Sequence, residues 1–148
     1  MTKEEKFTLA KLQAFTATDF EQYRERGEEA RLRLSSAVIA ALGLPDCWQI
    51  DCEHRQEWCG VHPVHLRLSH VSAPRVPIDI ISPSHESPYW YGRLWFEDAG
   101  SVVWFYSADS FNPEAIRAMI ARLDDYISAG YIEANTLAVA LRMGGNAV

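Results

Sequence analysis

The stretch that decides the fold is Tyr89-Trp-Tyr-Gly-Arg-Leu-Trp-Phe-Glu97, then Asp98-Ala-Gly100, then Ser101-Val-Val-Trp-Phe-Tyr106. Two runs rich in aromatic and β-branched residues flank a short polar break, which predicts a β-hairpin. A three-residue loop that ends in Gly100 suits a type I turn followed by a left-handed residue, so Glu97 should pair with Ser101. Counting back from this pair gives the remaining expected partners: Phe96 with Val102, Leu94 with Trp104, and Gly92 with Tyr106.

This register gives the hairpin one apolar face and one mixed face, because side chains alternate along a strand. Trp90 joins the six paired residues on the apolar face, which we expect to anchor the core. A helix layer over the mixed face would make it a second core layer, which is the commoner arrangement. Without such a layer it would be an exposed patch of aromatic and arginine residues, a composition typical of protein interfaces. The candidate partner-binding residues on this face are Tyr91, Arg93, Trp95, Glu97 and Phe105.

Strands also precede the hairpin, since apolar and polar residues alternate with a period of two from Cys47 onward. The five expected strands span residues 47–53, 63–70, 76–81, 89–97 and 101–107. Their connections are short, so the simplest topology is a five-stranded, mainly antiparallel meander.

Helices are expected at both ends of the chain. Thr2 with Glu5 and Thr18 with Glu21 fit capping boxes, and Asn112 followed by Pro113 is typical of a helix start. The predicted helices span residues 3–15, 19–42 and 113–129. Residues 133–143 alternate like a strand but contain good helix formers, and we favour a helix there.

The 19–42 helix has a regular apolar seam in steps of three and four residues, with small side chains at its middle. Gly27 and Ala30 would let another backbone approach closely. The seam could therefore pack on the first helix or on a second subunit, which makes a homodimer one hypothesis.

Length and composition fit one α+β domain over residues 1–148, with two N-terminal helices and one or two C-terminal helices packed on the sheet. No apolar run is long enough to cross a bilayer and no secretory signal is recognisable, so we expect a cytoplasmic protein without a membrane partner. Twenty acidic and fourteen basic residues give a net charge of −6. This charge argues against direct nucleic-acid binding and favours a basic partner protein.

An acidic patch should lie on the 19–42 helix, where Glu21, Glu25 and Glu28 join the candidate partner-binding residues. A solvated face is the usual reason for such charges. The patch could still steer the chain toward a cationic surface.

Metal chemistry is the main alternative, because all three cysteines and four of the five histidines fall between Cys47 and His70. The weak candidate ligands are Cys52, His54, Cys59 and His62. Their spacing matches no zinc-finger or ribbon pattern, so reduced thiols and surface histidines are the favoured interpretation, and no cofactor is predicted.

Acid–base chemistry could reside in the loop that holds Ser84, His85 and Glu86. Adjacent residues seldom orient one another as a base and its partner must, and no nucleophile motif accompanies them. An exposed polar turn is the favoured interpretation.

The first functional hypothesis is thus a small, acidic, non-catalytic protein that binds another protein, in the manner of an inhibitor of a basic nucleic-acid-handling complex. Anti-defence proteins, such as anti-CRISPR proteins, and toxin-neutralising proteins are examples of this class. The alternative is a metal protein or small enzyme that uses the 47–70 segment or the His85 loop.

Overall fold

The computed structural model describes residues 7–51, 63–84, 87–96 and 101–146, and its elements confirm the α+β class. They are, in order, α1 (Leu9–Ala14), α2 (Ala17–Glu25), α3 (Glu28–Leu42), β1 (Trp48–Asp51), β2 (His65–His70), β3 (Ala73–Ile81), β4 (Trp90–Phe96), β5 (Ser101–Ala108), α4 (Pro113–Ser128) and α5 (Ala134–Asn146). The five strands form one antiparallel sheet in the order β1-β2-β3-β4-β5, as the meander prediction required.

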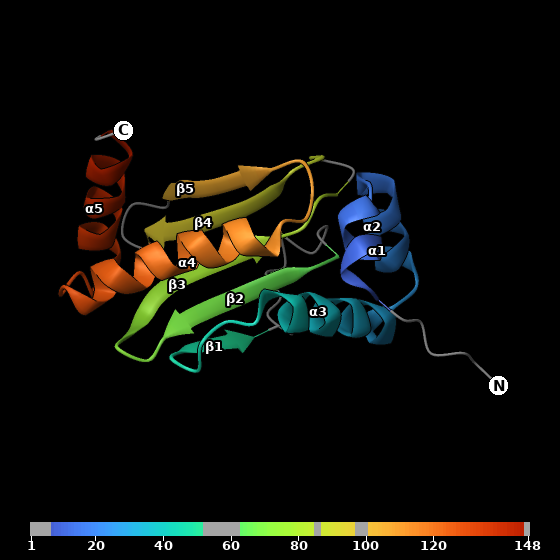
Figure 1. Ribbon diagram of the computed structural model, residues 1–148, viewed down its shortest axis with the longest axis horizontal. Coiled ribbons are helices and arrows are strands. Elements are labelled where there is room, and N and C mark those ends of the chain that lie inside the picture. The colour runs from blue at the N-terminus through green and yellow to red at the C-terminus, as the bar shows by residue number, and fades with distance from the viewer. Residues whose placement is uncertain (1–6, 52–62, 85–86, 97–100, 147–148) are drawn as a thin grey trace.

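The helices α3 and α4 lie across one face of the sheet, whereas α1 and α2 sit at one end of it and α5 at the other (Figure 1). On the helix-covered face, Leu68, Ile78 and Leu94 are register partners across β2, β3 and β4, and all three are fully buried. Trp90 is also buried and packs its ring against Phe20 of α2 at 5.3 Å between centroids. The hairpin therefore anchors the core through Trp90, as predicted.

The predicted register of the hairpin is partly wrong. Gly92 does pair with Tyr106, but Trp104 pairs with Arg93, because a β-bulge leaves Phe105 as an extra residue on β5. The remaining pairs are Leu94 with Val103, Trp95 with Val102, and Phe96 with Ser101.

The physical reason for the bulge lies at Gly92. The Phe105 ring lies so close to this residue that a Cβ atom there would be 2.5 Å from Phe105 Cε2. The absent side chain at Gly92 admits the ring, and the strand resets its alternation after it. Residues 97–100, including Glu97 and the expected turn at Gly100, lie outside the described residues.

The expected 19–42 helix is two helices, so the chain has three N-terminal helices rather than two. Gly27 separates α2 from α3 with a φ of 99°, a value that only glycine adopts readily. A Cβ atom on Gly27 would meet nothing within 4 Å. Within the described part of the chain, Gly27 thus allows a break in the helix, and no other segment of the chain packs closely on it. Tyr23 and Ala30 on either side are buried in the chain's own core.

The remaining helix predictions are mostly confirmed. Helix α4 starts with Pro113 after Asn112, whose Oδ1 accepts from the Ala115 N–H at 3.1 Å. The 134–146 segment is a helix. Two caps differ from expectation: Thr16 with Asp19 forms the capping box of α2, where Thr18 with Glu21 was expected, and Thr8 caps α1.

Among the helices that the structure describes, none combines the length and the apolar character needed to cross a bilayer.

Candidate partner-binding surface

A hollow of about 640 Å³ lies between α2 and the residues Ser84 and Pro88, and we call it the acidic groove. The capping box fixes where α2 begins, since Thr16 Oγ1 accepts from the Asp19 N–H at 3.3 Å and Asp19 Oδ2 accepts from the Thr16 N–H at 2.8 Å. The i,i+4 spacing then places Glu21 and Glu25 on one face of α2. Both line the groove, together with Ala17, Thr18 and Arg24.

The two carboxylates of the acidic groove differ in surroundings. Glu21 is half-buried and its Oε2 lies 3.7 Å from Arg24 Nε, whereas Glu25 is exposed. Glu28, the third predicted acidic residue, is exposed at the first turn of α3, beyond the break at Gly27. The predicted acidic patch therefore spans two helices rather than one.

The opposite wall of the groove connects to the hairpin. Ser84 and Ser87 exchange backbone hydrogen bonds, with Ser84 N to Ser87 O at 2.8 Å and Ser87 N to Ser84 O at 3.2 Å. The Ser87 hydroxyl is in turn hydrogen-bonded to the Tyr91 hydroxyl on β4. The structure thus brings two separately predicted surfaces, the acidic helix and Tyr91, to the same part of the molecule.

Tyr91 is half-buried on the sheet face opposite the helices. Burial, with a further contribution from neighbouring Tyr89, raises the pKa of the Tyr91 phenol above the usual tyrosine value. The phenol therefore stays protonated at neutral pH and keeps its hydroxyl as a hydrogen-bonding group.

The other predicted hairpin residues have mixed surroundings. Phe105 is half-buried over Gly92 and packs against the core. Trp95 occupies the strand position opposite Val102, but the structure does not describe its side chain. Glu97 lies outside the described residues. Arg93 is 7% exposed, so it belongs to the interior rather than to an open rim.

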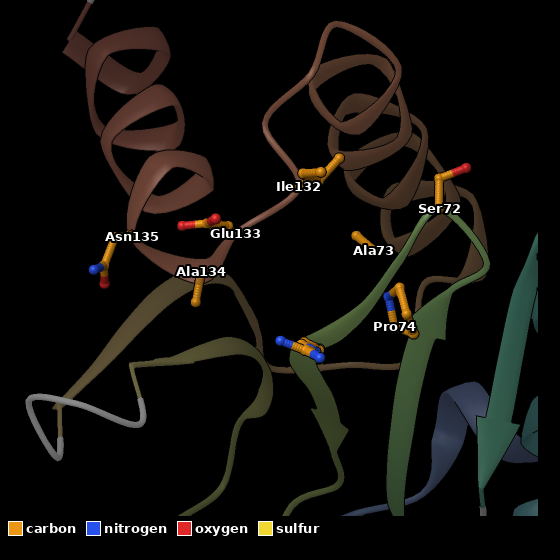
Figure 2. Close-up of a pocket in the computed structure, with 8 residues that line it drawn as sticks. Ser72, Ala73, Pro74, Ile132, Glu133, Ala134 and Asn135 are labelled. Carbon is orange, nitrogen blue, oxygen red and sulfur yellow. The ribbon is translucent and has the colours of Figure 1, made fainter.

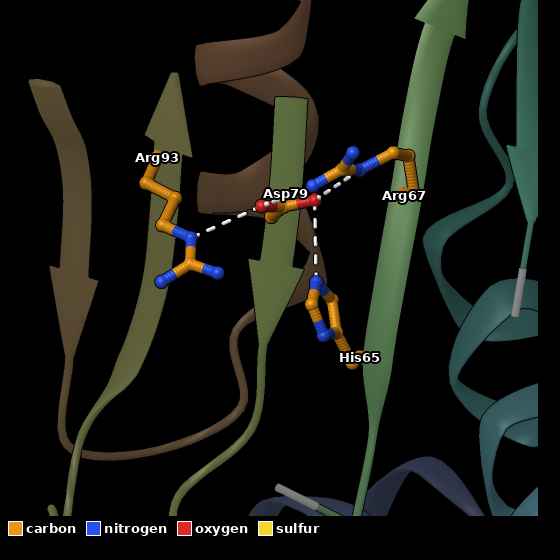
Figure 3. A network of polar contacts seen from close by, with 4 residues as sticks. All are labelled: His65, Arg67, Asp79 and Arg93. Carbon is orange, nitrogen blue, oxygen red and sulfur yellow. Dashed lines mark hydrogen bonds and ion pairs between the residues drawn. The ribbon is translucent and has the colours of Figure 1, made fainter. Parts of the chain in front are cut away.

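Arg93 takes part in a buried ionic network centred on Asp79 (Figure 3). Asp79 is fully buried, and it accepts from Arg93 Nε at 3.0 Å and from Arg67 Nε and NH2 at 2.8 and 3.1 Å. His65 Nε2 lies 3.2 Å from the same carboxylate. Burial raises the pKa of Asp79, but the hydrogen bonds and charges of His65 and Arg67 outweigh it and hold the pKa well below the usual aspartate range.

The sequence interpretation missed Asp79, although a signal was present. It is the only charged residue between Val76 and Ile81, in a strand that is otherwise apolar apart from Pro77. A lone carboxylate at such a position needs buried partners, and arginines on the neighbouring strands supply them.

The structure also assembles a Cys/His/Asp cluster that no spacing predicted. One ligand atom from each of Cys47, His70 and Asp124 lies within 4.8 Å of the others. The Ser72 N–H donates to His70 Nδ1 at 3.0 Å, so the ring proton is on Nε2, which donates to Asp124 Oδ1 at 2.6 Å. A metal-bound imidazole needs one free lone pair and a donating N–H on its other nitrogen. In His70 the lone pair on Nδ1 already accepts from Ser72, and the N–H on Nε2 is directed at Asp124. The cluster therefore fits a structural link between β2 and α4 better than a metal site.

The predicted ligands Cys52, His54, Cys59 and His62, and the proposed base His85, all lie outside the described residues. Their roles stay predictions.

The fold and the groove together define a small α+β protein whose candidate site is a surface depression lined by charged side chains. A family model described as "PsiB: Plasmid SOS inhibition protein (PsiB)" matches residues 6–144, and the chain belongs to this family. The description fits an inhibitor-type, non-catalytic role.

Proposed function

We propose that this chain inhibits its target by binding a protein that carries a basic surface, and that the acidic groove is part of the contact. The observation that carries the proposal is the family match over residues 6–144, whose description names SOS inhibition. The family description gives no support to the anti-CRISPR example, which stays a prediction. We also propose a cytoplasmic location, where a nucleic-acid-handling complex would be met.

Charge supports a basic partner. The chain carries a net charge of −6, and such a charge accelerates encounter with a cationic surface. Glu25 and Glu28 are exposed and Glu21 lines the groove beside Arg24, so three carboxylates lie at or near it. A nucleic-acid-handling protein presents lysines and arginines to phosphates. Carboxylates that occupy those cations compete with phosphate, so the chain and nucleic acid should bind the partner in mutual exclusion.

Aromatic residues beside the groove support a specific contact with the partner, in addition to the long-range electrostatic attraction. Tyr89 is 46% exposed and follows Pro88 of the groove wall, and Tyr91 bonds to Ser87. Tyrosines of this kind are frequent anchors of protein interfaces and stack favourably on arginine.

A reporter gene induced by DNA damage tests the inhibition in a bacterial host. Expression of the chain should lower induction, and the double substitution Glu21→Lys with Glu25→Lys should restore it. Glu29→Lys combined with Asp109→Lys is the matched control, because this pair makes the same total charge change at two exposed residues outside the groove. Full inhibition by the groove variant would contradict the proposed contact, and no inhibition by the native chain would contradict the function.

Affinity capture tests the mechanism separately. The immobilised chain should retain a basic protein that salt releases and that added single-stranded or double-stranded DNA displaces. Capture that DNA leaves unchanged would rule out competition for the cationic surface.

A further inference from the structure

A second hollow, of about 400 Å³, lies at the end of the sheet away from α2. Residues 72–75, which follow the β2–β3 turn into β3, form one wall, and residues 132–135, which lead into α5, form the other (Figure 2). Its volume is within the range of ordinary protein binding pockets.

One exposed apolar side chain lines this hollow, and another lies next to its wall in the sequence. Ile132 in its wall is 49% exposed, and Val71, which directly precedes the other wall, is 55% exposed. Ala73 is buried at the base. Large apolar groups exposed beside a depression are typical of a surface that another protein covers.

Two opposite charges stand on opposite walls of the hollow. Arg75 and Glu133 are both exposed, and within the described part of the chain neither side chain has an ion-pair partner. A two-fold axis through the hollow would bring Arg75 of one copy to Glu133 of the other, and the reverse contact would form by symmetry. A partner with one dominant charge would instead meet one favourable and one unfavourable group.

We propose that this end of the molecule is a homodimer interface, in which a second copy of the chain covers Val71 and Ile132 and pairs Arg75 with Glu133 twice. The surface is separate from the acidic groove, so the dimer and the inhibitor function stand or fall independently. It also differs from the predicted dimer seam around Gly27, whose neighbouring apolar residues face the chain's own core.

Charge reversal with rescue tests the pairing. Light scattering or sedimentation should give a mass that rises with concentration from 16.8 kDa toward twice that value. Arg75→Glu and Glu133→Arg should each raise the dimer dissociation constant about tenfold, since each acts twice in a symmetric interface. The double variant should return the constant to near its native value. Asp109→Arg, an exposed change elsewhere, is the control and should have no such effect.

The apolar contact is tested by Ile132→Ser, which should weaken the dimer, against Val139→Ser, an equally exposed apolar position on α5 outside the hollow. Circular dichroism checks that each variant folds. A mass of 16.8 kDa at every concentration would overturn the proposal. A dimer that resists Arg75→Glu and Ile132→Ser would also overturn it, and so would single reversals that the double variant fails to rescue.

Discussion

Arg93 on β4 donates from Nε to Asp79 Oδ2 on β3 at 3.0 Å, and the two residues are 7% and 0% exposed. They are also register partners in the sheet, so the ion pair joins two neighbouring strands on the face that α3 and α4 leave uncovered. Arg67 approaches the same carboxylate from β2, so Asp79 of β3 has partners on both neighbouring strands.

Asp79→Ala should lower the free energy of unfolding by about 3–5 kcal/mol, because it leaves a buried arginine without its counter-charge. Urea denaturation measures this loss. Asp51→Ala is the matched control, since Asp51 lies in the same cross-strand row but is exposed, and it should cost about 1 kcal/mol or less. Equal effects of the two substitutions would show that the network contributes little.

The pH dependence of stability should follow from the same carboxylate. The pKa of Asp79 is lower in the folded chain than in the unfolded one, so its contribution is present at neutral pH and is lost as pH falls. The native chain should lose stability progressively from about pH 5 toward pH 2, a loss that Asp79→Asn should flatten. Parallel pH profiles for the native chain and the variant would contradict the lowered pKa.

Arg117→Ala tests how α4 holds the end of α3. The Arg117 guanidinium donates from NH1 to the carbonyls of Ala41 and Leu42 at 3.0 and 3.1 Å, where the helix leaves its last carbonyls without partners. Losing a charged donor at a helix C-terminus should cost about 1.5–3 kcal/mol.

Arg122→Ala, on the same helix, is the control for this substitution. Within the described residues, the hydrogen bond of Arg122 and its contact with an aromatic ring are both to Tyr126, with NH2 3.4 Å from the hydroxyl. Its loss should cost less than about 1 kcal/mol. A larger loss for Arg122→Ala than for Arg117→Ala would refute the capping role.

Features set by local sequence were predictable. The periods of the strands, the Asn112-Pro113 start of α4 and the i,i+4 spacing of Glu21 and Glu25 all follow from neighbouring residues. The break at Gly27 also had a local signal, because Glu28 and Glu29 after a glycine are typical of a helix first turn.

Features set by distant contacts were not predictable. The second wall of the acidic groove comes from Ser84 and Pro88, about sixty residues beyond α2, and no pattern within α2 indicates them. The Asp79 network likewise joins residues from three strands.

The bulge at Phe105 likewise depends on a contact between two strands, so neither strand's own sequence predicts it. The substitution Gly92→Ala tests its cause. A Cβ atom at Gly92 would lie 2.5 Å from Phe105 Cε2 and 3.0 Å from Tyr106 Cβ, so the ring must move or the strands must separate. We expect a loss of about 1–3 kcal/mol in the free energy of unfolding. Phe105→Leu shortens the side chain that causes the clash, so it should relieve most of this loss when combined with Gly92→Ala. In a double-mutant cycle the two changes should therefore couple by about 1 kcal/mol or more, whereas additive costs would mean that the ring does not depend on the missing side chain.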